Sequence, residues 1–330
     1  MSSVLVTGGS GCLGRALIRS YLRDSRWTRV ASISRDEHKV AALHETFGAH
    51  EPFRAFLGDV RDRGRLQDAC QGIDLVIVAA ALKRVDVCSY NPDELFKTNV
   101  LGVDKTIRAA VACGVKKILL ISSDKACSAS NAYGLSKAMA EHIACSANVW
   151  AYPRGARVAA VRYGNIVDST GSVGHIWRKQ AAAGQRMTLT DARMTRFMMR
   201  VEDATKLIDY AVENMRGGEI YVPILPTASM YDFAIAIAPD SEIESVGLRP
   251  GGEKITEALL NDEEPSRTRR VSSKYLVVVP SHHAWVKGDP WGGDSVTAEA
   301  QHYRSDNPGP LGNKKLSVGE LRELLASTKA

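Results

Sequence analysis

The sequence of 330 residues has few aromatic side chains and no long apolar stretch. Phe, Trp and Tyr together make up 6% of the residues, which argues against the stacking surface of a protein that binds single-stranded nucleic acid. No apolar run reaches the roughly 18 to 20 residues that a membrane-spanning helix needs. The chain also enters a strand-like run almost at once instead of a leader segment. We therefore expect a cytoplasmic protein with no part in a membrane.

Cysteines and basic residues are present, but they are not gathered into sites. All six cysteines lie in the first half of the chain, without a CxxC pair or a spacing typical of metal ligands. We expect reduced thiols and no metal site. The net charge is +6, but Lys and Arg are dispersed, which indicates a small anionic ligand and no nucleic-acid partner.

Short apolar runs alternate with segments of helical spacing in the first half. The runs are VLVTG (4–8), RVASIS (29–34), FRAFLGD (53–59), DLVIVAAA (74–81), KKILLISS (116–123) and RVAAVRYGN (157–165). Between them, segments such as 95–114 carry apolar residues three and four positions apart. This alternation predicts an α/β fold with a Rossmann-type, doubly wound parallel sheet that is covered by helices on both faces.

The pattern becomes less regular after residue 165, where Gly and Pro clusters interrupt the helical segments. We expect residues 1–165 to form the domain that carries the chemistry. Residues 166–330 should form a smaller, irregular lobe for the substrate, with some segments returning to the core. At the end of the chain, Ser317 and Glu320 have the spacing of a capping box before a last helix.

A glycine-rich turn joins the first run to the first helical segment in VLVTGGSGCLGRAL. Glycines in this context allow a tight turn and a close approach of the backbone to a pyrophosphate, and the helix N-terminus offers N–H groups to the anion. The pattern therefore predicts a bound dinucleotide. The residues expected to hold its pyrophosphate are Gly8, Gly11, Cys12, Leu13 and Gly14.

The end of the second run bears on the choice between NADP and NAD. Ser34 and Arg35 are suited to a ribose 2′-phosphate, whereas an acidic residue at this position would accept a 2′-hydroxyl. Asp36 follows one residue later and keeps NAD possible, so NADP is favoured without excluding NAD. Further cofactor contacts are expected, from position alone, at Asp59, Val60, Ala79, Ala80 and Ala81.

Tyr133 and Lys137 stand four residues apart and so share one face of a predicted helix. A nearby ammonium favours the phenolate and lowers the tyrosine pKa from about 10, which makes Tyr133 a competent base for a sugar hydroxyl. Together with the glycine turn and with Ser123 at the end of the fifth run, this pair resembles the short-chain dehydrogenase/reductase superfamily in its extended form. The resemblance implies that Tyr133 and Lys137 also contact the cofactor.

A longer ordered set of motifs narrows the resemblance. The motifs are AALKRVDVCSYNPDELFKTNVLG (80–102), SSDKA (122–126), RYGNIVDSTGSV (162–173), MTRFMM (194–199), RPGGEKITEALL (249–260) and YRSDN (303–307). The chain thereby resembles the short, soluble UDP-N-acetylglucosamine 4,6-dehydratases that invert C5, in the polysaccharide biosynthesis protein family. These enzymes serve bacterial nonulosonate and capsule sugar pathways.

The resemblance implies a lyase that oxidises C4 transiently with tightly bound NADP, expels water across C5 and C6 and returns the hydride to C6. A 4-epimerase needs only Ser123, Tyr133 and Lys137, because it reduces the ketone in place. Dehydration needs an extra acid and base as well. By the resemblance, Asp124 is the acid at O6 and Lys125 the base at C5, where the retaining enzymes carry Glu.

Further positions are carried over as contacts with the UDP-sugar. Lys83 and Asn99 are expected to line the sugar pocket, and Asn165 is expected to bind a phosphate or sugar oxygen. The residues expected to hold the diphosphate and ribose are Arg196, Arg249 and Glu253. A surface role remains an alternative for each, and for Asn99 a hydrogen bond within its own helix. The superfamily also implies a homo-oligomer.

Three departures from the family pattern lie around the expected sugar and diphosphate. Residues 127–130 read CSAS where the family has Asn-Pro, Gly174-His175 replaces a proline, and one glycine is added at 251–252. We interpret Cys127 as a packed thiol, with a catalytic acid as the alternative. The product therefore stays open: a 5,6-dehydratase that releases an exo-glycal, a UDP-sugar 4-epimerase and a dinucleotide-sensing binding protein are the alternatives.

Overall fold

A mostly parallel sheet forms the centre of the computed structural model, which describes all residues except 168, 170, 249–251 and 328–330. Its parallel strands are β1 (Ser3–Thr7), β2 (Arg29–Ser34), β3 (Phe53–Leu57), β4 (Leu75–Val78), β5 (Lys117–Ile121), β6 (Arg157–Val161) and β10 (Ile220–Pro223). Three antiparallel strands extend the β10 edge, namely β13 (Thr268–Arg270), β14 (Tyr275–Val278) and β15 (Asp294–Ser295). The order is β15-β13-β14-β10-β6-β5-β4-β1-β2-β3. The predicted Rossmann-type fold is confirmed.

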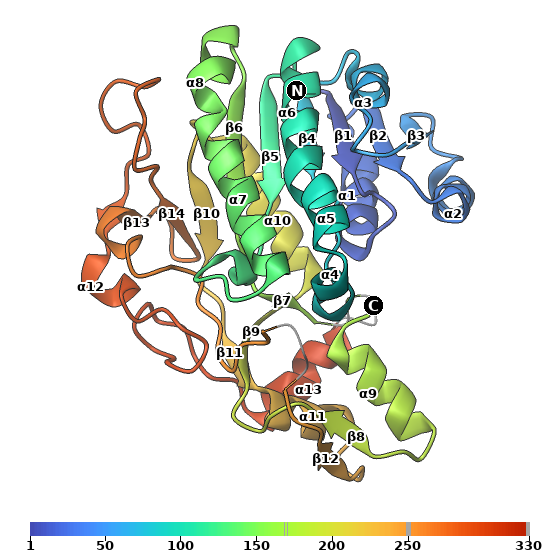
Figure 1. Cartoon of the computed structure of the whole chain (residues 1–330), viewed down its shortest axis with the longest axis vertical. Coiled ribbons are helices and arrows are strands. Elements are labelled where there is room, and N and C mark those ends of the chain that lie inside the picture. Colours follow the sequence, from blue (N-terminus) through green and yellow to red (C-terminus); the bar gives the residue numbers. More distant parts are fainter. Residues whose placement is uncertain (168, 170, 249–251, 328–330) are drawn as a thin grey trace.

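Helices cover both faces of the sheet, as apolar strands without polar alternation require (Figure 1). One face carries α3 (Arg63–Cys70), α6 (Gly102–Ala112) and α7 (Ala132–Ser146); the other carries α1 (Cys12–Arg23) packed against α10 (Val201–Asn214). α2 (Glu37–Phe47) packs on β3. Shorter helical pieces are α4 (Val85–Tyr90), α5 (Pro92–Leu95), the π-helix η1 (Phe96–Leu101), the 3₁₀ turn η2 (Asp124–Ala126), α8 (Asn148–Ala151), η3 (Tyr152–Arg154) and α12 (Thr297–Ala300). None of the helices in the described ranges is long and apolar enough to cross a membrane.

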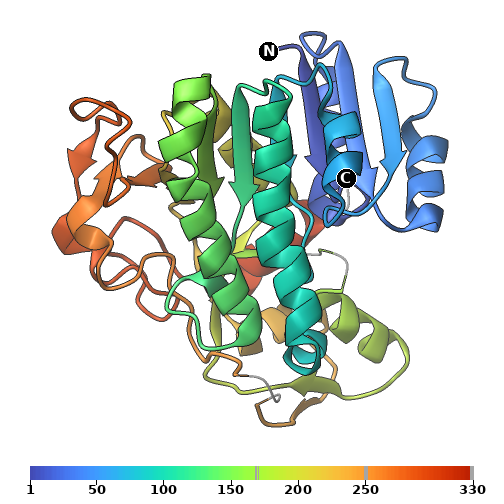
Figure 2. The ribbon, with the colours of Figure 1, turned by 45° about the horizontal axis from the view of Figure 1, so that its top comes forward.

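A smaller lobe lies beyond the carboxyl ends of the parallel strands, at the bottom of Figures 1 and 2. It contains the sheet β11-β9-β7, made of β7 (Asn165–Ile166), β9 (Thr195–Met199) and β11 (Thr227–Ser229), and the pair β8 (Met187–Leu189) and β12 (Ile243–Ser245). Its helices are α9 (Val173–Ala182), α11 (Met230–Ile237) and α13 (Val318–Ser327). These elements enclose a second apolar core around Trp177, Phe233 and Leu321.

The chain crosses between the two parts several times after residue 165. α10 and the strands β10, β13, β14 and β15 belong to the main sheet layer, although they follow the first lobe segments in sequence. The last helix, α13, returns to the lobe, and Ser317 and Glu320 form the expected reciprocal cap, with Ser317 N donating to Glu320 Oε2 at 2.9 Å and Glu320 N donating to Ser317 Oγ at 3.3 Å. The lobe is thus held to the sheet by chain connections as well as by packing.

A buried ion cluster also holds the chain that returns from the lobe onto the main sheet layer. Arg162, after β6, is 2% exposed and pairs with Glu141 of α7 at 2.6 Å and with Glu264 at 2.7 Å, just before the turn η4 (Pro265–Arg267). It also donates to the Leu259 carbonyl at 2.8 Å. Burial alone would raise the pKa of Glu264, but the Arg162 guanidinium outweighs burial and lowers it. The carboxylate therefore remains charged and holds the 259–264 segment in place.

Replacing Glu264 with Ala should lower the free energy of unfolding by about 3 kcal/mol, because the buried Arg162 then keeps only one carboxylate partner. Denaturant unfolding followed by circular dichroism measures the loss. Glu263→Ala, at the exposed neighbouring position, is the matched control and should change it by less than about 0.5 kcal/mol. Equal stability of the two variants would contradict this account.

Candidate active site

The glycine turn after β1 lies directly against the chain that leaves β4. Gly8 has φ +70, and a Cβ added there would lie 2.8 Å from Ala80 Cα, so only glycine fits this close approach. The amides of Ala79 and Ala80 donate to Thr7 Oγ1 at 3.0 and 3.1 Å, which fixes the loop from the other side. Ala81 is exposed at its end.

The N-terminus of α1 opens into the same corner and fits an anion. Helix α1 begins at Cys12 after Gly11, and no side chain caps its first N–H groups. Gly14 packs against Gly9, where an added Cβ would lie 2.5 Å from the Gly9 Cα, and Leu13 is half-buried. Uncapped N–H groups at a glycine turn suit the pyrophosphate of a dinucleotide, so these residues fit the cofactor that the fold implies.

A cavity of about 610 Å³ lies at the ends of β2 and β3, where the adenosine half of the cofactor would extend. Its lining includes the expected Arg35 and Asp59, and also His38 and Arg61, which the sequence did not single out. Their only sequence signal is their nearness to the strand ends. Two other expected residues lie deeper: Ser34 is 7% exposed and accepts from Ser10 N at 3.3 Å, and Val60 is 6% exposed in the core.

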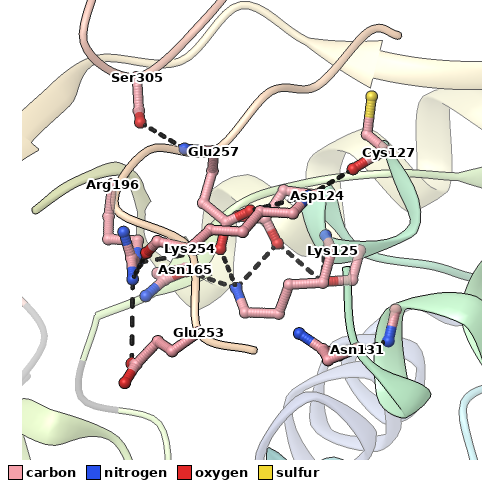
Figure 3. A network of polar contacts seen from close by, with 12 residues as sticks. Asp124, Lys125, Cys127, Asn131, Asn165, Arg196, Glu253, Lys254, Glu257 and Ser305 are labelled. Carbon is pink, nitrogen blue, oxygen red and sulfur yellow. Dashed lines mark hydrogen bonds and ion pairs between the residues drawn. The ribbon is translucent and has the colours of Figure 1, made fainter. Parts of the chain in front are cut away.

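Three polar residues follow the end of β5. Ser123 donates to Asp124 Oδ1 at 2.8 Å, and Lys125 Nζ lies 3.1 Å from the same oxygen. Lys125 also donates to Asn165 Oδ1 of β7 at 3.4 Å, so it reaches from the sheet to the lobe (Figure 3). Asp124 is fully buried, and its Oδ2 has no hydrogen-bond partner among the described residues. One carboxylate oxygen therefore remains available to a ligand.

Tyr133 and Lys137 stand on α7, whose first turn Asn131 caps by accepting from Gly134 N at 2.8 Å. Both side chains are buried, with 8% and 5% of their surface exposed. Lys137 Nζ donates to the Ile121 carbonyl, the last of β5, at 2.5 Å. Burial lowers the pKa of Lys137 to about 8, against the opposing effect of Glu141. The helix and the strand end thus bring the predicted Ser123, Tyr133 and Lys137 to one place.

The pKa of Tyr133 differs from the expectation. Burial raises it to about 12, Lys125 lowers it, and Asp124 raises it further. Lys137 donates to the backbone of β5 in the protein alone, so its effect on this pKa with the cofactor bound stays a prediction. Lys125 is the cation that favours the phenolate here.

The unusual segment 127–130 forms hydrogen bonds with residues of the lobe. Lys254 Nζ donates to the Cys127 carbonyl at 2.6 Å, and Ser130 and Asn131 donate to the Gly252 carbonyl at 3.1 Å each. Gly252 has φ +81, and a Cβ there would lie 2.6 Å from the Ser130 carbonyl oxygen. The Cys127 thiol is 1% exposed, and burial raises its pKa to about 12, which supports a packed thiol. His175 is exposed on α9.

The residues expected to contact the UDP-sugar differ in burial and in their hydrogen-bond partners. Asn99 is 1% exposed, accepts from Leu82 N and donates to the Leu82 carbonyl and to Ser136 Oγ, so its amide holds the loop after β4 onto α7. Lys83 is exposed in that loop. Arg249 lies outside the described residues. These contacts assign Asn99 a positioning role.

Arg196 of β9 is 5% exposed and uses its donors on backbone. It donates to the carbonyls of Thr195, Lys254 and Ile255 at 2.7 to 2.9 Å. Glu253 lies 3.9 Å away. The guanidinium therefore fixes the 253–255 turn, which brings Glu253 and Lys254 to the site, instead of pointing freely at a diphosphate.

Glu257 is the residue of this site that sequence reasoning missed. It is 2% exposed, and its Oε1 lies 3.4 Å from Lys125 Nζ (Figure 3). It belongs to the motif RPGGEKITEALL, but no spacing relates it to Lys125, which stands far away in sequence. Only the docking of the lobe brings the two together.

Comparison with known proteins agrees with this geometry. The family described as "Polysaccharide biosynthesis protein" matches residues 4–279. The chain belongs to this family. It is 37% identical over 276 residues to a protein of Campylobacter jejuni named UDP-N-acetylglucosamine 4,6-dehydratase (inverting), covering 83% of this chain and 82% of that one. It is 32% identical over 330 residues to a UDP-glucose 4-epimerase of Rickettsia typhi, covering 98% and 95%.

Solved structures share the fold of this member of the polysaccharide biosynthesis protein family. Pen from Bacillus thuringiensis matches with a TM-score of 0.88 and 32% identity over 99% of this chain and 98% of that one. DesIV, a dTDP-glucose 4,6-dehydratase of Streptomyces venezuelae, matches with a TM-score of 0.69 and 21% identity over 76% and 86%. The second likeness concerns the fold alone.

Proposed function

We propose that the protein is a lyase that dehydrates UDP-N-acetylglucosamine to a 4-keto-6-deoxy sugar nucleotide with inversion at C5, using bound NADP. The carrying observation is the Asp124–Lys125 ion pair beside Ser123 and Tyr133 at the end of β5. The Campylobacter jejuni relative, whose name states this reaction, supports the same substrate.

Each side chain of the site has a distinct task in this reaction. A bound nicotinamide cofactor would supply the redox chemistry of the reaction, in which a hydride leaves C4 of the sugar and returns at C6. Tyr133 accepts the proton of the C4 hydroxyl, and Ser123 and the charge of Lys125 favour its phenolate. Asp124 protonates the departing O6 through its free Oδ2, while Lys125 removes the C5 proton that the C4 ketone has acidified. Lys125 then holds a proton beside C5 for its return.

The Asp124–Lys125 pair carries the number of protons that this chemistry needs. As an ion pair it holds one transferable proton, on Lys125 Nζ, 3.1 Å from Asp124 Oδ1. Moving that proton across the pair gives a carboxylic acid and a neutral amine, which are the acid and base for loss of water. A substrate that excludes water makes this neutral form less unfavourable, since isolated charges are costly in a dry site.

A 4-epimerase is the second candidate, because the Rickettsia typhi relative that covers almost the whole chain is named as one. An epimerase has no step that requires an acid at O6 or a base at C5. The buried, half-partnered Asp124 beside Lys125 therefore favours dehydration. Release of an exo-glycal would use the same two residues, but the hydride would return to C4 instead of C6.

Incubation of the protein with UDP-N-acetylglucosamine should give a product with a C6 methyl signal in proton NMR and with loss of water in its mass. An exocyclic alkene signal would indicate the exo-glycal, and no loss of water would indicate the epimerase. Asp124→Asn and Lys125→Ala should each slow dehydration by roughly 100-fold or more, the usual effect of a general acid or base. Full dehydration by the double variant would contradict the assigned roles.

The NADP preference is supported by the environment of Asp36. This residue caps α2 by accepting from Lys39 N at 3.1 Å, and its carboxylate also lies 3.3 Å from Lys39 Nζ. It is thereby engaged away from a ribose hydroxyl, whereas Arg35 and His38 line the cavity. A 2′-phosphate is the ligand that this basic pair suits.

Arg35→Ala should weaken NADP binding by roughly 10- to 100-fold, the value of a charge-assisted hydrogen bond, and leave NAD binding almost unchanged. Calorimetric titration of both cofactors at fixed salt measures the two affinities. Arg63→Ala, at an exposed position outside the cavity lining, removes the same charge as a control. An equal loss for NAD and NADP would contradict a 2′-phosphate contact.

A homo-oligomer is proposed through an exposed apolar face on η1 and α7, which pack against each other. On it Phe96 is 51%, Leu135 60% and Met139 50% exposed. Large exposed apolar side chains on neighbouring elements are typical of association surfaces. All six cysteines are free, which supports the proposed location in the reducing cytoplasm.

Leu135→Glu should shift the protein toward monomer, because it buries a charge in that interface. Sedimentation velocity measures the change. Val246→Glu, at an equally exposed apolar position of the lobe, should leave the assembly unchanged. Identical sedimentation of wild type and Leu135→Glu would exclude this face as the interface.

A further inference from the structure

We propose that Glu257 is a positioning residue that keeps Lys125 charged and fixes it between the sheet and the lobe. Glu257 Oε1 lies 3.4 Å from Lys125 Nζ, on the lobe side of the ammonium, while Asp124 lies 3.1 Å away on the strand side. The inference deepens the proposed function and rests on it for the kinetic consequence.

The backbone of Glu257 is held tightly. Its N–H donates to Ser305 Oγ at 2.8 Å, and its carbonyl accepts from Ser305 N at 2.8 Å. Ser305 in turn donates to the Thr195 carbonyl of β9 at 3.1 Å. Figure 3 shows the carboxylate pointing from this anchored turn toward Lys125. Position 257 is therefore fixed without the help of its side chain.

The Glu257 carboxylate has ion contacts on both oxygens, and its Oε2 has no hydrogen-bond partner among the described residues. Lys125 lies at 3.4 Å and Arg196 at 4.0 Å from Oε1, and Lys254 lies at 3.8 Å from Oε2, which is buried without a hydrogen-bond partner. A purely structural buried carboxylate is normally hydrogen-bonded. This carboxylate acts instead through its charge on the cations around it.

The groups that face Lys125 come from four elements. They are Asp124 of η2, Glu257 of the 252–260 segment, Arg196 of β9 and Tyr133 of α7. Burial alone would lower the pKa of Lys125, but Asp124 and Glu257 outweigh burial and the repulsion of Arg196, and raise it. Removing either carboxylate charge must therefore lower the pKa of Lys125.

The positive charge of Lys125 affects two proton transfers of the proposed reaction. The Lys125 ammonium lowers the pKa of Tyr133, so Glu257 favours the first proton transfer without touching the sugar. The same ammonium supplies the proton that the Asp124–Lys125 pair shares. Because Glu257 comes from the lobe, the pair has its full charge balance only when the lobe is docked.

The test is a direct titration of Lys125 in the free protein. Protein labelled with ¹³Cε-lysine is followed by NMR against pH, and the Lys125 signal is identified by its absence in Lys125→Arg. In the wild type, this signal should keep the chemical shift of an ammonium above pH 10.5, which is the ordinary pKa of a lysine. In the isosteric variant Glu257→Gln its midpoint should fall by about one pH unit or more.

A second variant and a control complete the titration. Glu257→Asp keeps the charge but moves it away from Nζ, so its midpoint should lie between those of the wild type and Glu257→Gln. This variant also decides the question if Glu257→Gln does not fold. Glu263→Gln, the same change at an exposed position just after that segment, should titrate as the wild type. An unchanged Lys125 midpoint in a folded Glu257 variant would overturn the proposal.

The kinetic readout separates this proposal from the proposed function. In Glu257→Gln, the part of the profile of kcat against pH that reports the titration of Lys125 should shift to lower pH, as the NMR midpoint does. KM should change little, because Glu257 is buried behind Lys125. A wild type that forms no dehydrated product would refute the proposed function, and the titration would still decide on Glu257. Normal dehydration with an unmoved limb would refute the role of Glu257 alone.

Discussion

One partly buried cation, the ammonium of Lys125, places the strictest demand on this structure. A buried charge is costly unless opposite charges stand close to it. Asp124 supplies one carboxylate from the end of β5, and Glu257 supplies another from the lobe. Because these partners belong to separate parts of the chain, the active site exists as a chemical unit only when sheet and lobe are assembled.

Other contacts between the sheet layer and the chain of the lobe help to keep Asp124, Lys125 and Glu257 together. Arg162 joins Glu141 of α7 to Glu264 of the returning chain inside the protein. Arg196 holds the turn that carries Lys254, and Lys254 holds the carbonyl of Cys127. These contacts are buried or nearly so, and separating the lobe would leave several polar groups unsatisfied. The family departure at residues 127–130 thus lies where the lobe contacts the chain that follows β5.

Much of the fold could be predicted from the sequence because its signals are local. The six apolar runs predicted β1 to β6 but not the parallel strand β10, and the glycines predicted a tight turn after β1, since a missing side chain is visible in sequence. Ser123, Tyr133 and Lys137 could be placed together because a strand end and one helix face bring them there. Asn99 and Arg196 could not be interpreted in this way: each looked like a ligand contact, but their donors serve backbone carbonyls of distant loops.

The sequence by itself determined the Rossmann-type sheet, the dinucleotide turn and the polar strand end, because each depends on neighbours within one turn or one strand. Only the tertiary structure decided the electrostatics of the site. The pKa of Tyr133 is raised by burial and lowered by Lys125, and Lys125 is held charged partly by Glu257. Such effects depend on distances of a few ångströms between groups far apart in sequence, and no local pattern contains those distances.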